Sequence, residues 1–243
     1  MIVSAKTDIG MKRSTNQDSF SYGQLDSGAV TWAVVCDGMG GMAAGNIASS
    51  TAVEVISGSF ENNLSPKSSA SVVRNLLKSS IESANARVHN MAFEKEEYRG
   101  MGTTVVAVVV IKGVAYIAHA GDSRMYFYSN NQLTQITTDH SVVQTLIEKG
   151  QLTEQEAKNH PNKNVITRAL GVNSYIDIDF EEIEVSQGDS LLLCTDGLTN
   201  CIDDELIKLA TSDNDFPTLA ERLVELANQN GGYDNITAVA VKI

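Results

Sequence analysis

The sequence of 243 residues predicts an α+β fold in which helices flank two antiparallel sheets. Three observations support this. β-rich segments lie near both ends of the chain, four more follow one another through its middle, and the helical patterns form separate blocks between them. Strands joined by tight turns pair antiparallel, because parallel strands need long crossovers. No tract is long enough to separate two domains, so we expect one domain over residues 1–243.

The first third of the chain contains β-rich segments followed by helices. Residues 2–8 and 30–36 are expected strands. Small and apolar residues at helical spacing predict a helix over 42–60. A stretch rich in Ser, Asn and Pro then ends this helix, and a longer one is expected over about 66–93.

The middle of the chain is strongly β-rich. Tight turns at Lys112-Gly113 and Asn130-Asn131 separate strands expected over 103–111, 113–121, 123–129 and 131–136. The following segment, about 141–165, has a polar helical pattern, and we interpret it as a small helical insertion over the sheet. The last elements are strands over 176–185, 189–196 and 235–243, and helices near 203–211 and 217–230.

Composition excludes several functions. The formal net charge of −12 argues against a partner with a phosphate backbone or an anionic membrane surface. No run approaches the roughly 18 apolar residues of a membrane helix, and the N-terminus lacks the pattern of a secretory signal. Cys36, Cys194 and Cys201 have no CxxC spacing, so we expect reduced thiols and a cytoplasmic location.

Four aspartates each lie at the edge of an apolar, strand-like run. They are Asp18, Asp37, Asp196 and Asp234. A carboxylate at a strand end is costly unless positive charge meets it. If the four converge, they form an oxygen-rich pocket suited to Mg²⁺ or Mn²⁺. Each alone is also an ordinary turn residue, so the prediction rests on their co-occurrence in a chain with no Cys/His metal set.

The segment after Asp37 has two interpretations. Gly38, Gly40 and Gly41 let the backbone bend sharply, which would leave a carboxylate and a free carbonyl for a hard cation. The same residues match the dinucleotide fingerprint G-x-G-x-x-A, which would indicate a nicotinamide-dependent oxidoreductase. An aspartate directly before the first glycine would repel pyrophosphate, and this argues against the second interpretation.

Other polar residues leave alternatives open. Arg13 suits bidentate capture of a phosphate but is equally compatible with a solvated surface position. Asp122 lies between two expected strands, where it could belong to an ordinary hairpin turn. His119 is expected in the core or at a sheet edge. His140 begins the helical insertion, where capping explains Asp139 and Ser141 nearly as well as catalysis does.

Taken together, these residues resemble the metal-dependent protein Ser/Thr phosphatases of the type 2C (PPM) family, in particular its compact bacterial members. The resemblance runs nearly end to end through eight motifs in order: Arg13-Ser-Thr-Asn-Gln-Asp18, Asp37-Gly-Met-Gly-Gly41, Gly102-Thr-Thr104, Gly121-Asp-Ser-Arg124, Asp139-His-Ser141, Thr167-Arg-Ala-Leu-Gly171, Thr195-Asp-Gly-Leu198 and Asp234-Asn-Ile-Thr237.

The resemblance implies a four-layer α-β-β-α sandwich and a site for two Mn²⁺ or Mg²⁺ ions. The implied ligands are Asp37, the Gly38 carbonyl, Asp196 and Asp234. It also implies that Asp18 supports the site, Arg13 holds the substrate phosphate, and Asp122 with Asp196 offers a weaker third-metal site. Residues 141–165 would be a flap beside the active site.

The activity implied is hydrolysis of phosphoserine and phosphothreonine on proteins by a hydroxide that bridges the two cations. The expected partners are phosphoproteins modified by a cognate Ser/Thr kinase, and we expect a monomer. Gln17 stands where the family often has Glu, and Met39 where animal members have a His proposed as general acid; bacterial members commonly share this Met. A non-catalytic phosphoprotein-binding module on the same scaffold is the alternative from another functional class.

Overall fold

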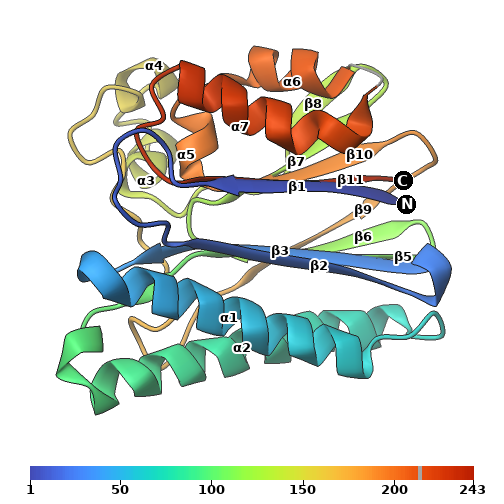
Figure 1. The fold of residues 1–243 in the computed structure, drawn as a ribbon, viewed down its shortest axis with the longest axis horizontal. Coiled ribbons are helices and arrows are strands. Elements are labelled where there is room, and N and C mark those ends of the chain that lie inside the picture. Colours follow the sequence, from blue (N-terminus) through green and yellow to red (C-terminus); the bar gives the residue numbers. More distant parts are fainter. Residues whose placement is uncertain (213–214) are drawn as a thin grey trace.

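Two antiparallel sheets stacked face to face form the centre of the protein, and helices cover both outer faces (Figure 1). The computed structural model describes residues 1–212 and 215–243. This four-layer arrangement confirms the predicted α+β class. It excludes the oxidoreductase interpretation, because the glycines after Asp37 follow a strand whose sheet neighbours are antiparallel and not part of a parallel βαβ unit.

The first sheet joins the two ends of the chain. Its strands are, in spatial order, β1 (Ile2–Asp8), β11 (Ile236–Lys242), β10 (Ser190–Cys194), β7 (Arg124–Ser129) and β8 (Gln132–Gln135). The second sheet contains β2 (Asp18–Leu25), β3 (Val30–Met39), β5 (Val105–Ile111), β6 (Val114–Ala120) and β9 (Asp179–Glu184), and the short β4 (Gly102–Thr103) pairs with the end of β3. Strand β2 was not among the predicted strands.

Two long helices cover the second sheet, α1 (Gly41–Asn63) and α2 (Ala70–Glu94) (Figure 1). The first sheet is covered by α5 (Asp196–Thr199), α6 (Asp204–Ser212) and α7 (Leu219–Gln229). The insertion contains α3 (Val142–Glu148) and α4 (Glu154–Ala157), and single turns of 3-10 helix are η1 (Asp26–Gly28), η2 (Glu96–Tyr98) and η3 (Phe216–Thr218). The long helix begins at Ala70 and not near Pro66, because the Ser69 side chain caps it. None of the described helices is long and apolar enough to cross a membrane.

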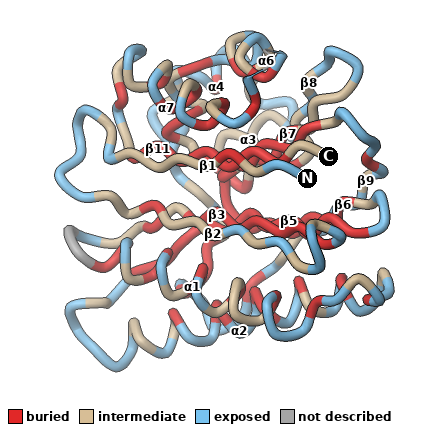
Figure 2. Tube along the Cα trace, turned by 45° about the vertical axis from the view of Figure 1, so that its right-hand side comes forward, coloured by how far each residue is buried: buried red, intermediate tan, exposed pale blue. Residues whose placement is uncertain are grey.

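Alternation of side chains along the strands divides the core into three layers. Ala33, Val35 and Val106 of the second sheet face Leu191, Leu193 and Val239 of the first. Their sequence neighbours point outward, where Trp32 and Val34 meet α1 and α2 while Leu192 and Ala238 meet the helices of the first sheet. Both faces of the central strands are therefore buried, as Figure 2 shows for β3 and β5.

One connection differs from the prediction. The turns at Lys112-Gly113 and Asn130-Asn131 do join antiparallel neighbours, and all four residues have positive φ, as such tight hairpins require. The segment Gly121–Ser123 is not a hairpin turn, since β6 lies in the second sheet and β7 in the first. The chain changes sheets at Asp122, so the ordinary hairpin turn left open for this residue does not occur. Sequence periodicity cannot distinguish the two cases, because in both a short segment of turn-forming residues lies between two β segments.

Candidate active site

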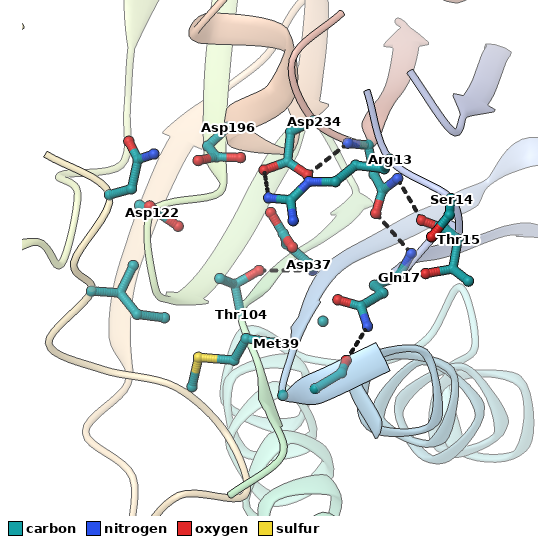
Figure 3. Close-up of a pocket in the computed structure, with 16 residues that line it drawn as sticks. Arg13, Ser14, Thr15, Gln17, Asp37, Met39, Thr104, Asp122, Asp196 and Asp234 are labelled. Carbon is teal, nitrogen blue, oxygen red and sulfur yellow. Dashed lines mark hydrogen bonds and ion pairs between the residues drawn. The ribbon is translucent and has the colours of Figure 1, made fainter. Parts of the chain in front are cut away.

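A cleft of about 520 Å³ lies at one end of the sandwich, where strands of both sheets end (Figure 3). Of the seven residues predicted for the site, six line it: Arg13, Asp37, Gly38, Asp122, Asp196 and Asp234. Asp37 comes from β3 in the second sheet, whereas Asp196 follows β10 and Asp234 precedes β11 in the first. The cleft therefore spans the boundary between the two sheets.

Asp37 is fixed through its backbone. Its N–H donates to the Thr104 hydroxyl at 2.9 Å, and its carbonyl accepts from the Thr104 N–H at 2.9 Å. Gly38 follows in a confined space, where a Cβ would collide with the carbonyl oxygens of Gly45 and Gln17. Only glycine fits here without displacing the chain, which explains the Asp-Gly pair.

Asp18 lies beneath the cleft and does not line it. The register of β2 against β3 places it directly opposite Asp37, so two carboxylates face each other across the pair of strands. Asp18 Oδ2 accepts hydrogen bonds from the hydroxyls of Thr195 at 2.9 Å and Thr237 at 2.7 Å, whereas its Oδ1 is buried without a partner. Burial raises the pKa of Asp18 to about 7.

The pKa values of the other carboxyl groups are raised by the same causes. Burial, and then repulsion from Asp18, raises the pKa of Asp37 well above its usual range. Burial, followed by repulsion from Asp196, raises the pKa of Asp122 to about 8. For Asp196 burial and the charge of Asp234 raise the pKa to about 6. In the absence of a cation, it is therefore unfavourable for all of these carboxyl groups to be ionised at the same time.

Asp196 and Asp234 each use part of their hydrogen-bonding capacity locally. Asp196 Oδ2 accepts from the Asn200 side chain at 2.9 Å, while its Oδ1 is buried without a partner. Asp234 Oδ1 accepts from the Asn235 N–H at 2.8 Å, and its Oδ2 forms an ion pair with Arg13 Nη2 at 2.7 Å (Figure 3). Arg13 therefore points its guanidinium into the cleft and is not a free surface residue.

The donor set fits a pair of divalent cations. It consists of oxygen atoms, which Mg²⁺ and Mn²⁺ prefer. Asp18 and Asp196 each have a buried carboxylate oxygen to which none of the described residues donates a hydrogen bond. Cations in the cleft would satisfy the unpartnered oxygen of Asp196 and offset the repulsion that raises the pKa values, including that of Asp18 beneath them.

Several residues with a clear place in the site were not assigned one from the sequence. The Asn235 side chain holds the loop that carries Arg13, because its Nδ2 donates to the carbonyls of Ile9 and Thr15, each at 2.9 Å, and its Oδ1 accepts from the Gln17 N–H at 2.9 Å. Asn164 and Ile166 line the cleft from the insertion. The motifs contained Asn235 and Thr104, but nothing in the residue types showed which atoms they would bind.

A second polar cluster lies behind Asp122. His119 and His140 stack with ring centroids 4.6 Å apart, and Asp179 is 3.1 Å from His140 Nε2. Burial lowers the pKa of both histidines, so both rings are neutral at pH 7. The prediction of a core or edge position for His119 is confirmed, since the ring is buried.

The capping prediction beside His140 is half confirmed. Ser141 caps α3 by accepting a hydrogen bond from the Gln144 N–H at 3.1 Å. Asp139 is not a cap. It accepts two hydrogen bonds, both of 2.8 Å, from the guanidinium of Arg124. A bidentate pair of this kind is stronger than a helix cap, and it fixes the start of β7.

Comparisons with known proteins agree along nearly the whole chain. The family model described as protein phosphatase 2C matches residues 11–239. Protein phosphatase PhpP of Streptococcus pneumoniae is 39% identical over 244 residues, which cover 100% of this chain and 98% of that protein. Serine/threonine phosphatase stp of Listeria welshimeri is 36% identical over 239 residues, which cover 98% of this chain and 94% of that protein.

Solved structures show the same architecture. The serine/threonine phosphatase of S. agalactiae matches with a TM-score of 0.92 and 35% identity, covering 100% of this chain and 99% of that one. The catalytic domain of the serine threonine protein phosphatase PstP, in complex with 2 manganese ions, matches with a TM-score of 0.87 and 31% identity. The match covers 99% of this chain and 97% of that one. The motifs, the sandwich and these matches agree, and this chain belongs to the protein phosphatase 2C family.

Proposed function

We propose that this protein phosphatase hydrolyses phosphoserine and phosphothreonine on proteins with the help of two Mn²⁺ or Mg²⁺ ions. The observation that carries the proposal is the convergence of aspartates from both sheets on one cleft that also receives Arg13. Asp37, the Gly38 carbonyl, Asp196 and Asp234 would hold the ions, and Asp122 with Asp196 would hold a weaker third. Bound cations of this kind supply an activated water and offset negative charge on the phosphate.

The chain's own residues contribute positioning and charge. Among the described residues that line the cleft, Arg13 has the only cationic side chain, so we assign it the substrate phosphate, which a guanidinium binds through two parallel hydrogen bonds. Asp18 supports the site from below, where its charge would act on the cations without contacting substrate. Residues 141–165 form one wall through Asn164, in agreement with a flap that meets the substrate.

A covalent mechanism through cysteine has no support. Cys36 and Cys194 are fully buried within strands, and burial raises the pKa of Cys194 to about 12 and that of Cys36 further still. Met39 lines the cleft at the position expected of a general acid in animal relatives, and the part of the chain that the structure describes contributes no histidine to the lining. We infer direct transfer of the phosphoryl group to water, with the leaving-group proton also supplied by solvent in the cleft.

The biological setting follows from the family and stays a proposal. We infer a cytoplasmic enzyme, acting as a monomer of one domain, that reverses the action of a cognate Ser/Thr kinase. Its acidic net charge of −12 agrees with protein substrates and not nucleic acid.

The decisive experiment combines metal removal with one substitution. Turnover of p-nitrophenyl phosphate and of a phosphothreonine peptide is measured with Mn²⁺, with Mg²⁺ and in excess EDTA. We expect activity only with metal, and a loss of at least about 100-fold in Asp37→Asn, because a carboxylate that acts on the transition state is removed. Asp177→Asn removes the same charge at an exposed position and serves as the matched control. Full turnover in EDTA, or near-normal turnover of Asp37→Asn, would rule the mechanism out.

A further inference from the structure

Asp122 is held on both sides by side chains from other segments. On one side, the Gly121 N–H donates to His140 Nδ1 at 3.1 Å, and the His140 N–H donates to the Gly121 carbonyl at 2.9 Å. On the other side, the Ser123 and Thr104 hydroxyls are 2.7 Å apart, and Thr104 also binds the backbone of Asp37. Asp122 itself is only 9% exposed. The backbone that carries the Asp122 carboxylate therefore has little freedom to move unless one of these two contacts breaks.

His140 is also the point from which the insertion begins and to which it returns. Its carbonyl accepts from the Thr167 N–H at 2.7 Å, at the returning end of the insertion. Next to it, the Val142 N–H donates to the Val165 carbonyl at 2.9 Å, and Ser141 pairs with Ile166 in an isolated bridge. The two stems of the insertion are thus joined directly beside the residue that holds Gly121.

The buried Gly121 amide favours one of the two ring tautomers of His140. The backbone hydrogen of Gly121 points at Nδ1, so Nδ1 must present a lone pair. In a neutral ring the proton is then on Nε2, where Asp179 Oδ2 accepts it at 3.1 Å. The other oxygen of Asp179 accepts from Arg168 Nη1 at 2.6 Å. In the opposite tautomer Nε2 would accept from Arg168 Nη1, 2.9 Å away, and the buried Gly121 amide would lose its partner.

A metal ion at this cluster is the competing explanation. His119, His140 and Asp179 each offer a ligand atom, and these atoms lie within 4.8 Å of one another. A cation is already present, however, because the Arg168 guanidinium pairs with Asp179 and also contacts His140. His119 Nε2 is 3.0 Å from the Thr138 carbonyl, which can only accept, so this nitrogen carries a proton and cannot ligate. Among the described residues His119 Nδ1 is buried without a hydrogen-bond partner, but the Arg168 guanidinium already supplies the positive charge that Asp179 attracts, so we assign the cluster no metal.

We propose that His140 is a positioning residue that couples the Asp122 carboxylate to the base of the 141–165 flap, through a neutral imidazole whose Nδ1 accepts from Gly121 and whose Nε2 donates to Asp179. Movement of the flap stems changes the position of His140, and the Gly121 bond transmits this change to Asp122. The catalytic consequence rests on the proposed phosphatase function, whereas the coupling itself does not.

Two substitutions separate the two ring nitrogens. Asn at position 140 places its amide oxygen near the position of Nδ1 and keeps the acceptor for Gly121, whereas Gln places its amide near Nε2 and loses that acceptor. We expect His140→Gln to lower kcat/KM with a phosphothreonine peptide about tenfold, the effect of one unpaired buried amide, and His140→Asn to stay within about threefold of wild type. His89→Asn, in α2, is the matched control. Equal losses in the Asn and Gln variants would overturn the proposal.

Nuclear magnetic resonance of the metal-free wild-type protein tests the coupling without any turnover. The chain has 4 histidines, so a long-range ¹H–¹⁵N imidazole spectrum can be assigned with the His140→Asn variant. We expect the Nε2–H tautomer for His140, slow exchange of the Gly121 amide, and faster exchange of that amide in His140→Gln. A proton on Nδ1 or an unprotected Gly121 amide in wild type would refute the inference. If the protein were inactive with every metal, the proposed function would fail while these measurements still decided the role of His140.

Discussion

Replacing Asp18 by Asn should stabilise the metal-free protein and weaken the metal-loaded one. Burial places the pKa of Asp18 at about 7, against 3.8 for an ordinary aspartate, a difference of about three units. At pH 8 the carboxyl is ionised in both states, so this difference lowers the free energy of unfolding by about 4 kcal/mol, at 1.36 kcal/mol per pKa unit. Asn avoids this cost but leaves an amide group at the unpartnered Oδ1 position, which costs about 1–3 kcal/mol.

The expected net gain is about 2 kcal/mol in EDTA at pH 8. For a chain of this size it corresponds to a rise in Tm of about 4–8 °C. The gain should shrink at pH 5, where the folded carboxyl keeps its proton. With Mn²⁺ present the sign should reverse, because the cations then favour the ionised carboxylate.

Thermal unfolding followed by circular dichroism, with and without Mn²⁺ and with Asp177→Asn as control, measures both effects. Equal destabilisation of Asp18→Asn in EDTA and in Mn²⁺ would refute this reasoning, since it would show Asp18 to be only an acceptor for Thr195 and Thr237.

Three further predictions concern the same cleft. The metal-free protein should lose stability from pH 4 to pH 8. The folded protein has carboxyl groups with raised pKa values (Asp196 about 6, Asp18 about 7, Asp122 about 8), and these keep protons that the unfolded chain releases near 3.8. A Tm in EDTA that is flat or rises over this range would contradict the prediction. Thr104→Val should lower the free energy of unfolding by about 1–3 kcal/mol and reduce kcat, because it removes the hydroxyl that binds the Asp37 N–H and the Ser123 hydroxyl. Thr104→Ser keeps this hydroxyl and should keep both values. Urea unfolding with steady-state kinetics tests this, and equal effects of Val and Ser would be inconsistent with it. Arg13→Ala should raise KM for a phosphopeptide roughly tenfold with Lys12→Ala as control, and an unchanged KM would leave Arg13 with a structural role at Asp234.

The sequence predicted the carboxylates of the site better than the residues that hold them in place. Carboxylates at the ends of apolar runs are visible because a charge interrupts an apolar pattern, as at Asp37 and Asp196. The residues that hold them, such as Asn235 and Thr104, have ordinary polar side chains. Their partners lie far away in the chain, at separations of up to 226 positions for Asn235 and Ile9, and no local pattern encodes that contact.

The fold was predicted where local physics decides it. Hairpin turns with positive φ and apolar runs located most strands and their antiparallel pairing. The exception was Asp122, where the chain leaves one sheet for the other. Whether β7 pairs with β6 or with β10 depends on packing against the rest of the core, so the information is not contained in the turn itself.

The apolar side chains packed between the two sheets set the distance between the two halves of the acidic cleft. Val35 lies two positions before Asp37, and Leu193 three before Asp196, so the width of this apolar layer limits how closely the two halves of the cleft can approach. Ala33→Leu adds volume between the sheets at a position that does not line the cleft. We expect it to push the sheets apart and so to increase the distance between the carboxylates on the two sides of the cleft. Volume deep in the interior is thus a means of tuning the enzyme from a distance.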